Sequence, residues 1–419
     1  MPPESQNRDL KKLRYTKKPR VIFLTQWFDP EPTIRGNKFV EKLATAGYDI
    51  EVVTGFPNYP TGRIYPGFKL QSIVKEQRNA YTLTRLWLFP NHSQNVLLRA
   101  LNYLSFAFSS LIYLTFFAPK FDLLYVYHPP LTTALVGSLV KAFRRVRLIL
   151  DVQDLWPDTL SSTGMITHKL MLKFLGLVCK IAYRSADKIS VLSPGFRKLL
   201  INRNVNSDKI ETIYNWANEY DRESIKASGR LAKDKFNILL AGNMGPAQDI
   251  ETIILAAKII SSKQPEIHIV LVGGGIYWNR IDEQIKTLNL ENISIHQQVS
   301  PVEIRNDYEL ADVLLVHLKK DPLFAITIPS RTQTCLYAGK PILMCVDGDA
   351  AGIVVDAKAG QLAESGNSEA IAEAMLSLYN LSSAEREQMG KNGQKFYYDQ
   401  MSLDVAIKKL ARLFCTVLQ

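Results

Sequence analysis

The alternation of short apolar runs with helix-length segments constrains this 419-residue chain more than any other feature. From Arg20 onward, runs rich in Val, Ile and Leu alternate with amphipathic segments long enough for a helix, which is typical of parallel sheets with crossover helices. The pattern occurs in both halves, so we expect an α/β fold with two Rossmann-like domains facing a central cleft. The expected strands are 21–26, 49–54, 84–88, 123–127, 147–152 and 188–192 in the first half, and 237–242, 268–273, 293–296, 313–317 and 341–345 in the second.

Composition changes along the chain indicate where these domains begin and end. The polar stretch 201–235 is the expected linker, and the last helical segment is expected to pack back across the domain boundary. Residues before Arg20 are polar and basic without an apolar segment, so no signal peptide is indicated. The expected parts are a disordered basic leader (1–19), a first Rossmann-like domain (20–205), a second Rossmann-like domain (206–400) and a helix near the domain boundary (401–419).

Charge is distributed unevenly between the two halves. Residues 1–200 hold 28 Lys and Arg against 13 Asp and Glu, although the whole chain has a formal net charge of only +11. A basic first half indicates an anionic partner such as a phospholipid surface or a lipid phosphate, whereas nucleic acid is not expected because no nucleic-acid-binding motif accompanies the charge. The 4 cysteines show no paired spacing, which favours a reducing cytoplasm.

One apolar run without any charge extends from Ala100 to Ala118. This run is long enough to span a bilayer. However, the expected strands on either side of it could not share a sheet if it crossed a membrane. We therefore favour a helix that packs on the sheet or lies in the membrane interface, with the protein peripherally attached to the inner membrane from the cytoplasmic side.

The segment from Ile328 to Cys345 is the strongest candidate binding element. A Pro-Ser-Arg turn leads into a short helical run that ends at Ala-Gly-Lys-Pro and is followed by an apolar strand. Because a helix N-terminus presents unpaired N–H groups and Arg331 adds a guanidinium, the segment is a plausible cradle for a diphosphate.

Two glycine-containing loops follow strands of the second half. The loop with Gly242 and Gly245 precedes a helix expected near Asp249, so it is a second candidate phosphate cradle. Gly273 and Gly274 follow the next strand, where close strand–helix packing explains the glycines equally well. No Gly-x-Gly-x-x-Gly fingerprint occurs after the first strand, so the usual dinucleotide site is not indicated.

The first half offers candidate polar residues at expected strand ends. Asp154 is preferred over Asp151 and Asp158 as the carboxylate that points into the cleft, and His128 also lies at a strand end. The pair Arg35-Gly36 opens the next helix, where it could bind an anionic group or form a plain turn. The Asp-Gly-Asp sequence at 347–349 resembles a metal-binding motif, but a turn is favoured and no metal is expected.

These motifs together resemble glycosyltransferase family 4, whose members are retaining enzymes of the GT-B fold. The resemblance rests on Asp-Val-Gln-Asp-Leu-Trp-Pro, Ala-Gly-Asn-Met-Gly and the segment at 328–345, and it covers nearly the whole chain after Lys18. The sequences Gln-Trp-Phe-Asp-Pro-Glu-Pro and Val-Thr-Gly-Phe-Pro-Asn-Tyr-Pro resemble the WbuB/WcaI-like subgroup, which includes enzymes assigned as L-fucosamine transferases.

The chain departs from the family pattern at its charged positions. Ile326 and Thr334 stand where the family usually has two glutamates, Asn243 and Gln248 stand where it has Arg and Lys, and Gln153 replaces a His. Arg331 is the obvious replacement for the lost positive charge. The resemblance implies catalytic roles for Asp154 and Arg331 and a donor site that consists of Gly242, Asn243, Met244, Gly245, Gln248, Gly273, Gly274, Val299, Ser330, Arg331 and Thr334, with Arg35, Gly36 and His128 on the acceptor side.

The function that the resemblance implies is transfer of a sugar from a UDP-sugar to a polyprenyl-diphosphate-linked saccharide, with retention. The sugar is expected to be an N-acetylated deoxyhexosamine such as L-FucNAc, and the pathway to be O-antigen (lipopolysaccharide), capsule or exopolysaccharide biosynthesis. No cofactor is expected beyond the sugar nucleotide. A UDP-sugar epimerase of the same fold and a non-catalytic GT-B scaffold remain alternatives.

Overall fold

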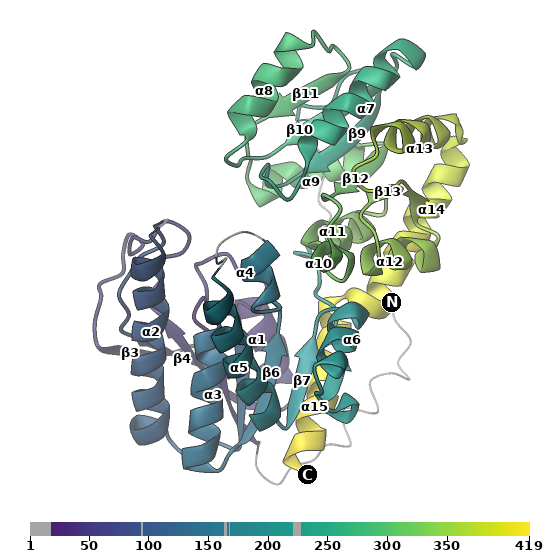
Figure 1. Cartoon of the computed structure of the whole chain (residues 1–419). Helices are drawn as coiled ribbons and strands as arrows, with labels where there is room; N and C mark the ends of the chain where they lie inside the picture. The colour runs from purple at the N-terminus through teal and green to yellow at the C-terminus, as the bar shows by residue number, and fades with distance from the viewer. Residues whose placement is uncertain (1–17, 94, 163–165, 167, 221–227) are drawn as a thin grey trace. The chain divides into compact units, whose positions relative to one another are not determined.

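The computed structural model describes residues 18–93, 95–162, 166, 168–220 and 228–419 (Figure 1). The chain forms two compact units. Most of the expected disordered leader, up to residue 17, lies outside the described residues. The N-terminal unit comprises Met1–Leu192, Phe196–Ile213 and Ala406–Gln419, and the C-terminal unit comprises Ser193–Gly195 and Tyr214–Val405.

The N-terminal unit ends after the expected boundary at residue 205, and the chain returns to this unit at its C-terminal end. The N-terminal unit continues to Ile213 rather than to residue 205, because the start of the expected linker forms a short helix, η4 (Ser207–Lys209), and the edge strand β8 (Ile210–Thr212). The C-terminal segment from Ala406 belongs to the N-terminal unit, where the Tyr48 hydroxyl donates a hydrogen bond of 3.0 Å to the carbonyl of Ala411.

The N-terminal unit is built on an eight-stranded sheet in the order β3-β4-β2-β1-β5-β6-β7-β8. Only β3 runs antiparallel among the strand pairs of the described residues. The inner order is that of a doubly wound sheet, with its topological switch point between β1 and β5. The other strands are β1 (Arg20–Leu24), β2 (Asp49–Gly55), β3 (Ile73–Gln77), β4 (Thr82–Leu86), β5 (Leu123–His128), β6 (Arg147–Val152) and β7 (Lys188–Val191).

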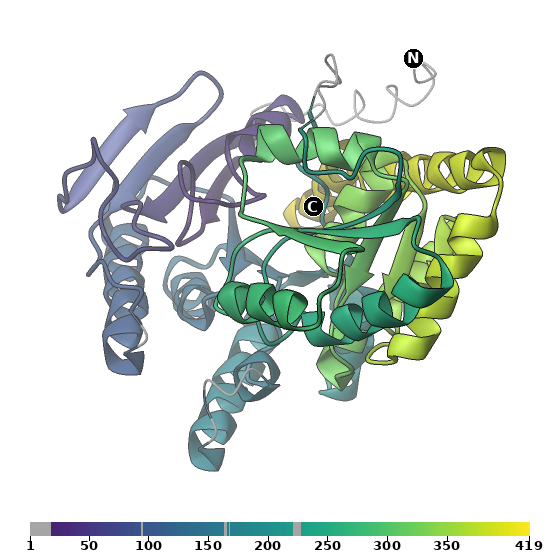
Figure 2. The same cartoon turned by 90° about the horizontal axis from the view of Figure 1, so that it is seen from above.

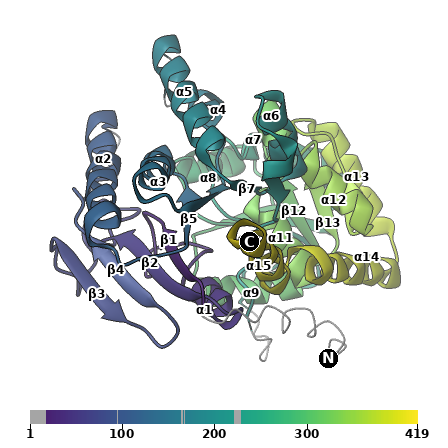
Figure 3. The ribbon, with the colours of Figure 1, turned by 90° about the horizontal axis from the view of Figure 1, so that it is seen from below.

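Helices cover both faces of this sheet (Figure 3). On one face, Phe39 of α1 (Asn37–Thr45) and Phe414 of α15 (Leu403–Leu418) both pack on the ring of Tyr125. The opposite face carries α2, which continues into the π-helix η3, together with α3 and α5. The bounds are α2 (Val96–Ile112), η3 (Tyr113–Phe117), α3 (Leu131–Arg144), α4 (Asp158–Ser162), α5 (Lys169–Ser185) and α6 (Pro194–Asn202).

The expected helix in the apolar run 100–118 packs on this sheet. The strands that flank it, β4 and β5, belong to the same sheet, as the argument against a membrane span requires. Hydrogen bonds from Gln26 to Asn102 (2.7 Å) and from Asn102 to the carbonyl of Phe89 (2.7 Å) fix α2 to the unit. By length and composition alone, Val96–Phe117 is apolar enough to cross a membrane, and it is the one such helix among the described residues.

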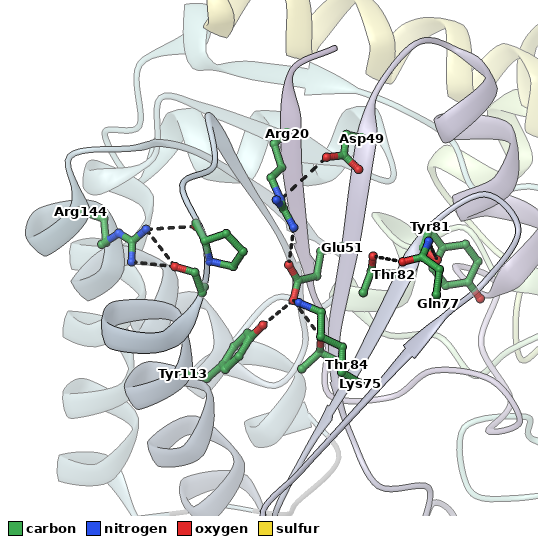
Figure 4. Close-up of polar contacts among 12 residues, drawn as sticks. Arg20, Asp49, Glu51, Lys75, Gln77, Tyr81, Thr82, Thr84, Tyr113 and Arg144 are labelled. Atoms are coloured by element: carbon green, nitrogen blue, oxygen red, sulfur yellow. Dashed lines mark hydrogen bonds and ion pairs between the residues drawn. The ribbon is translucent and has the colours of Figure 1, made fainter. Parts of the chain in front are cut away.

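A buried carboxylate ties the edge of the N-terminal sheet to η3 (Figure 4). Glu51 of β2 accepts hydrogen bonds from Tyr113 (2.5 Å) and Thr84 (2.8 Å) and forms an ion pair with Arg20 (3.2 Å). Burial raises the pKa of Glu51, but the hydroxyl donors and the nearby Lys75 and Arg20 outweigh it and leave the pKa below its ordinary value. The ionised Glu51 carboxylate already has hydrogen-bond donors and cationic partners within the unit, so its role is structural.

The C-terminal unit is built on a six-stranded parallel sheet in the order β11-β10-β9-β12-β13-β14. Its switch point lies between β9 and β12. Helices α7 and α13 share an apolar core with β9 and β10. The strands are β9 (Phe236–Ala241), β10 (Ile267–Val272), β11 (Ile293–His296), β12 (Val313–His317), β13 (Ile342–Cys345) and β14 (Gly360–Leu362). The helices are α7 (Ile250–Lys263), α8 (Trp278–Thr287), α9 (Pro301–Leu310), α10 (Pro322–Ala325), α11 (Ser330–Ala338), α12 (Asp349–Ala357), α13 (Ser368–Asn380), α14 (Ser383–Phe396) and η5 (Tyr397–Met401).

Two threonines of β4 provide a matched test of the Glu51 cluster. Thr84 donates to the buried carboxylate, whereas half-buried Thr82 makes a similar bond (3.0 Å) to Gln77 on the exposed strand β3. We expect Thr84→Val to lower the free energy of unfolding by about 1–3 kcal/mol, because a buried acceptor loses its donor. Thr82→Val should change it by less than about 0.5 kcal/mol. Equal effects in urea unfolding would contradict the structural role of the cluster.

Candidate active site

The candidate site of the C-terminal unit lies at the switch point of its sheet. The loop after β9 and the N-terminal turn of α11, which follows β12, meet there. Helix α11 begins at Ser330 and ends with Gly339 in a left-handed conformation (φ 75°), and β13 follows. The short helix, its end at Ala-Gly-Lys-Pro and the following strand, all expected for 328–345, are therefore confirmed.

The glycines of the two loops are explained by close backbone approach. A side chain at Gly273 would place its Cβ 1.8 Å from the carbonyl oxygen of Gly242. The amide of Met244 donates a hydrogen bond of 2.7 Å to the carbonyl of Gly274, so the loops after β9 and β10 are bonded to each other. Helix α7 begins at Ile250, directly after Asp249, as expected.

Arg331 is a cation without an anionic partner among the described residues. A Cβ at Gly242 would lie 2.7 Å from its Nε, so the guanidinium rests directly on the glycine loop. Its Nη2 donates a hydrogen bond of 3.3 Å to the carbonyl of Asn243, and its buried Nη1 has no hydrogen-bond partner in the described part of the chain. Burial lowers the pKa of Arg331, although it remains charged in proteins. Such a group is prepared to bind an anion.

A cavity of about 440 Å³ opens beside this arginine. Six of the expected donor residues line it, which brings together parts of the chain that the sequence analysis treated separately. These six are Gly242, Asn243, Gly273, Gly274, Val299 and Thr334. The other lining residues, which sequence reasoning did not identify, include Asn218, Tyr220, Gln298, Pro301, Ile304, Arg305 and Tyr308.

The remaining expected donor residues lie around this cavity without appearing in its lining. The side-chain oxygen of Gln248 accepts hydrogen bonds from the amide of Gly245 (3.0 Å) and from Asn243 (3.4 Å), which closes the turn. Met244 is fully buried, and the carbonyl of Ser330 accepts a bond of 3.3 Å from Thr334. Gln248 thus shapes the loop at the position where the family has a cation.

His317 is a further residue of this region that the sequence analysis missed. It lies at the end of β12, and its Nδ1 is 2.9 Å from the carbonyl oxygen of Gln248. Its buried Nε2 has no hydrogen-bond partner in the described part of the chain. Burial lowers the pKa of His317, which favours the neutral form of the ring. In the sequence, His317 lies at the end of an expected strand, as His128 does, and this position could have identified it as a candidate site residue.

In the N-terminal unit, Asp154 follows β6 as expected and is largely buried. Burial raises the pKa of Asp154 to about 6, and a hydrogen bond with the Thr159 side chain lowers it only partly. His128, at the end of β5, is fully buried beside Trp156, and neither ring nitrogen has a partner among the described residues. Burial lowers the pKa of His128 to about 4, so this ring is also neutral.

Arg35 is placed differently from the simple expectation of an exposed anion site. It is 1% exposed, and its Nε lies 2.5 Å from Asp151 Oδ2. Asp151 also accepts hydrogen bonds from Tyr125 (2.6 Å) and Ser190 (2.9 Å). The guanidinium already has an internal carboxylate, which lies far away in the sequence. Gly36 is the N-cap residue of α1 and, as a glycine, has no side chain that could cap the helix.

The acidic sequence at 347–349 forms the turn that was favoured over a metal motif. Gly348 has a φ of 75°, and Asp349 begins α12. The Asp349 carboxylate accepts a hydrogen bond of 2.6 Å from the amide of Gly195. The described residues contain no cluster of three or more His, Cys, Asp or Glu that could hold a metal ion.

Family models match both units of the chain. Residues 35–216 match the glycosyl transferase 4-like domain, and residues 221–396 match the glycosyl transferases group 1. With the two parallel sheets, these matches define an enzyme that transfers glycosyl groups, a glycosyltransferase of the GT-B fold. Within that class, the chain belongs to glycosyltransferase family 4.

Two bacterial relatives are similar over much of the chain. The Escherichia coli protein named "Putative colanic acid biosynthesis glycosyl transferase WcaI" is 24% identical over 74% of this chain and 79% of its own length. The capsular polysaccharide biosynthesis glycosyltransferase CapM of Staphylococcus aureus is 23% identical over 58% of this chain and 66% of its own length.

Solved structures share the fold at low sequence identity. Sucrose-phosphate synthase from Thermosynechococcus elongatus has a TM-score of 0.69 at 16% identity, covering 95% of this chain and 99% of that chain. HepE from Anabaena in complex with UDP-glucose has a TM-score of 0.64 at 14% identity over the same shares. The GT-B fold expected from the sequence is therefore confirmed.

Two glycines of the C-terminal unit test the packing of the loops. Gly273→Ala should destabilise the unit by about 1–3 kcal/mol, because the new methyl group meets backbone that cannot move aside. Gly352→Ala, within α12 and with no atom within 4 Å of the new Cβ, should instead stabilise by about 0.5–1 kcal/mol. Thermal unfolding of both variants checks the pair, and a neutral Gly273→Ala would contradict the described loop contact.

Proposed function

We propose that this glycosyltransferase moves a sugar from a UDP-sugar to a polyprenyl-diphosphate-linked saccharide during the synthesis of a bacterial surface polysaccharide. The names of WcaI and CapM support the pathway class, and the UDP-glucose complex of HepE supports the donor class. Within that class we propose an N-acetylated deoxyhexosamine such as L-FucNAc as the transferred sugar. The WbuB/WcaI-like resemblance of the N-terminal motifs supports this choice.

The observation on which the proposal depends is the unpaired guanidinium of Arg331. A buried cation costs free energy unless an anion compensates it. Arg331 rests on the loop at Gly242 beside a cavity of about 440 Å³ at a switch point, where ligands of doubly wound sheets bind. A diphosphate supplies the missing negative charge, and the cavity accommodates the attached nucleoside.

The proposed chemistry needs a cation where the leaving group departs. The bond between the anomeric carbon and the diphosphate oxygen breaks, and a bond forms from an acceptor hydroxyl oxygen to the same carbon with retention. Arg331 stabilises the charge that develops on the diphosphate. The hydroxyl proton passes to the departing diphosphate, or to Asp154 if that carboxylate is the base.

A lipid-linked acceptor implies contact with a membrane. We propose that the protein is cytoplasmic and attaches peripherally to the inner membrane through the helix formed by the run 100–118. The basic composition of residues 1–200 suits an anionic leaflet.

A transfer assay tests the proposed function. The protein is incubated with membrane-extracted lipid-linked acceptor and radiolabelled UDP-, GDP- or dTDP-sugars, and the label that moves to the lipid is recorded. We expect label only from a UDP-sugar. An altered sugar formed from UDP-sugar alone would favour the epimerase, whereas failure to bind any sugar nucleotide would favour the scaffold.

Substitution of Arg331 should separate catalysis from folding. Removing one preorganised donor to the leaving group costs about 100–1,000-fold in turnover, which we expect for Arg331→Ala. Arg331→Lys should recover part of the rate because it keeps the charge but not the planar fork. The control Arg280→Ala removes an exposed arginine that pairs with Glu251 at 2.6 Å, and it should keep full activity. Full activity of folded Arg331→Ala would refute the assignment.

The pH dependence tests the role of Asp154. The pKa of this carboxylate is raised to about 6, so a base at this position is ionised above that pH and protonated below it. We expect kcat/KM to fall about tenfold per pH unit below the pKa, and Asp154→Asn to be slow without this decline. A folded Asp154→Asn variant with the wild-type profile would assign the proton to the diphosphate instead.

A further inference from the structure

Helix α2 buries mainly polar side chains and exposes apolar ones, which is the opposite of a helix that packs on an apolar core. Its buried side chains include Asn102 and Ser105, which bond to the unit's interior. Leu97, Leu104 and Phe108 are 79%, 58% and 65% exposed. With Leu101 they form one stripe at helical spacing. Three of the four buried side chains of α2, those of Asn102, Ser105 and Ser110, are polar and only that of Phe106 is apolar, whereas the apolar stripe faces outward.

Helix α5 repeats this arrangement. Leu170, Phe174, Leu177 and Ile181 have the same spacing as the stripe of α2, and each is at least 48% exposed. The buried residues of the helix are confined to its C-terminal half, namely Cys179, Ala182 and Tyr183. A helix with so little packing on its own unit lacks the apolar contact that stabilises helices in water.

These two helices belong to one layer. Helix α3 lies between them and contacts both, and all three project from the same side of the N-terminal sheet (Figures 2 and 3). Phe143 of α3 is 67% exposed, and Phe117 of η3 is 71% exposed. The exposed apolar side chains of α2, η3, α3 and α5 therefore belong to one helical layer, and we call the outer surface of this layer the helical face. Exposed apolar side chains gathered in this way mark an interaction site.

The charges of the helical face are all of one sign. None of α2, η3, α3 and α5, each of which is described in full, contains an Asp or Glu. Lys169, Lys173, Lys180 and Arg184 of α5 are exposed in a stripe beside its apolar residues. Long cationic side chains of this kind can extend from an apolar surface to the phosphates of a membrane interface.

A groove at the C-terminal ends of α3 and α5 adds further cations. It has a volume of about 610 Å³ and is lined by Lys141, Arg145 and Arg147 together with Ser138 and Ser185. Asp187 pairs with Lys141 at 2.7 Å and approaches Arg147 at 3.9 Å. The lining still has an excess of positive charge, which suits a lipid phosphate.

We infer that the helical face is a docking surface for an anionic phospholipid bilayer and that α5 enters the interface beside α2. This deepens the membrane attachment proposed above, on which it rests, by adding a second helix and by identifying the lysines and arginines that would meet the anionic lipid. A second copy of the chain fits less well, because two such faces would bring lysines together without acidic partners.

Vesicle co-sedimentation of the full chain tests the inference. We expect binding to vesicles of phosphatidylglycerol and phosphatidylethanolamine, weak binding to phosphatidylcholine vesicles, and weaker binding at high salt. Lys173→Gln and Lys180→Gln should each weaken binding about fivefold, because a lysine near an anionic surface contributes on the order of 1 kcal/mol. Equal binding to both vesicle types would overturn the anionic selectivity.

Matched double variants identify the helix that inserts. Phe174→Glu with Leu177→Glu places two charges on α5, and we expect at least a tenfold loss of vesicle binding. The control Leu255→Glu with Val355→Glu changes the same net charge at exposed apolar positions of the C-terminal unit, 47% and 57% exposed, and should bind like the wild type. Unchanged binding of the α5 variant, or equal loss in the control, would overturn the inference.

A second assay separates this inference from the proposed function. Transfer to a detergent-solubilised acceptor should be unaffected by the α5 variant. If the wild type transfers sugar but does not bind vesicles, the docking surface is refuted while the function stands. A wild-type dimer in sedimentation velocity that the α5 variant converts to a monomer, without vesicle binding, would assign the face to a second copy.

Discussion

The contact of the Arg331 guanidinium with the loop at Gly242 is the interaction on which the donor site depends. A Cβ at Gly242, whose φ is 143°, would lie 2.7 Å from the arginine and would push its side chain away. The arginine is in place because α11 begins at Ser330, directly after Pro329. No carboxylate of the described residues compensates the charge. The C-terminal unit therefore keeps this cation without an anionic partner in its described part, beside its glycine loops, and to this cation we assign the leaving diphosphate in the proposed function.

The N-terminal unit uses its buried charges in the opposite way. Arg35 is neutralised by Asp151 and Glu51 by Arg20, so these groups stabilise the sheet and its helices. Its excess positive charge is instead on the surface, including the exposed lysines of α5. The two units thus carry their uncompensated positive charge differently, the C-terminal unit on one half-buried guanidinium and the N-terminal unit on many exposed side chains.

Much of the fold could be predicted from local patterns, whereas the cavity could not. The edge strands β3, β8 and β14 were missed because they are short or alternate with exposed polar residues. Arg331 was found because helix start and stop signals are local. Tyr308 and Arg305 were missed because they reach the cavity from α9, a helix whose position only tertiary packing defines. Likewise, the sequence of α5 does not show how few of its side chains pack on the unit, because that depends on tertiary packing.

Titration calorimetry with UDP and with uridine examines the role of Arg331 without the chemical step, because the two ligands differ only by the diphosphate. We expect Arg331→Ala to weaken UDP binding at least about tenfold, as for the loss of a charge-assisted bond. Uridine binding should not change. Equal UDP affinity in the wild type and the variant would show that Arg331 does not bind the diphosphate, and so would an equal loss for both ligands.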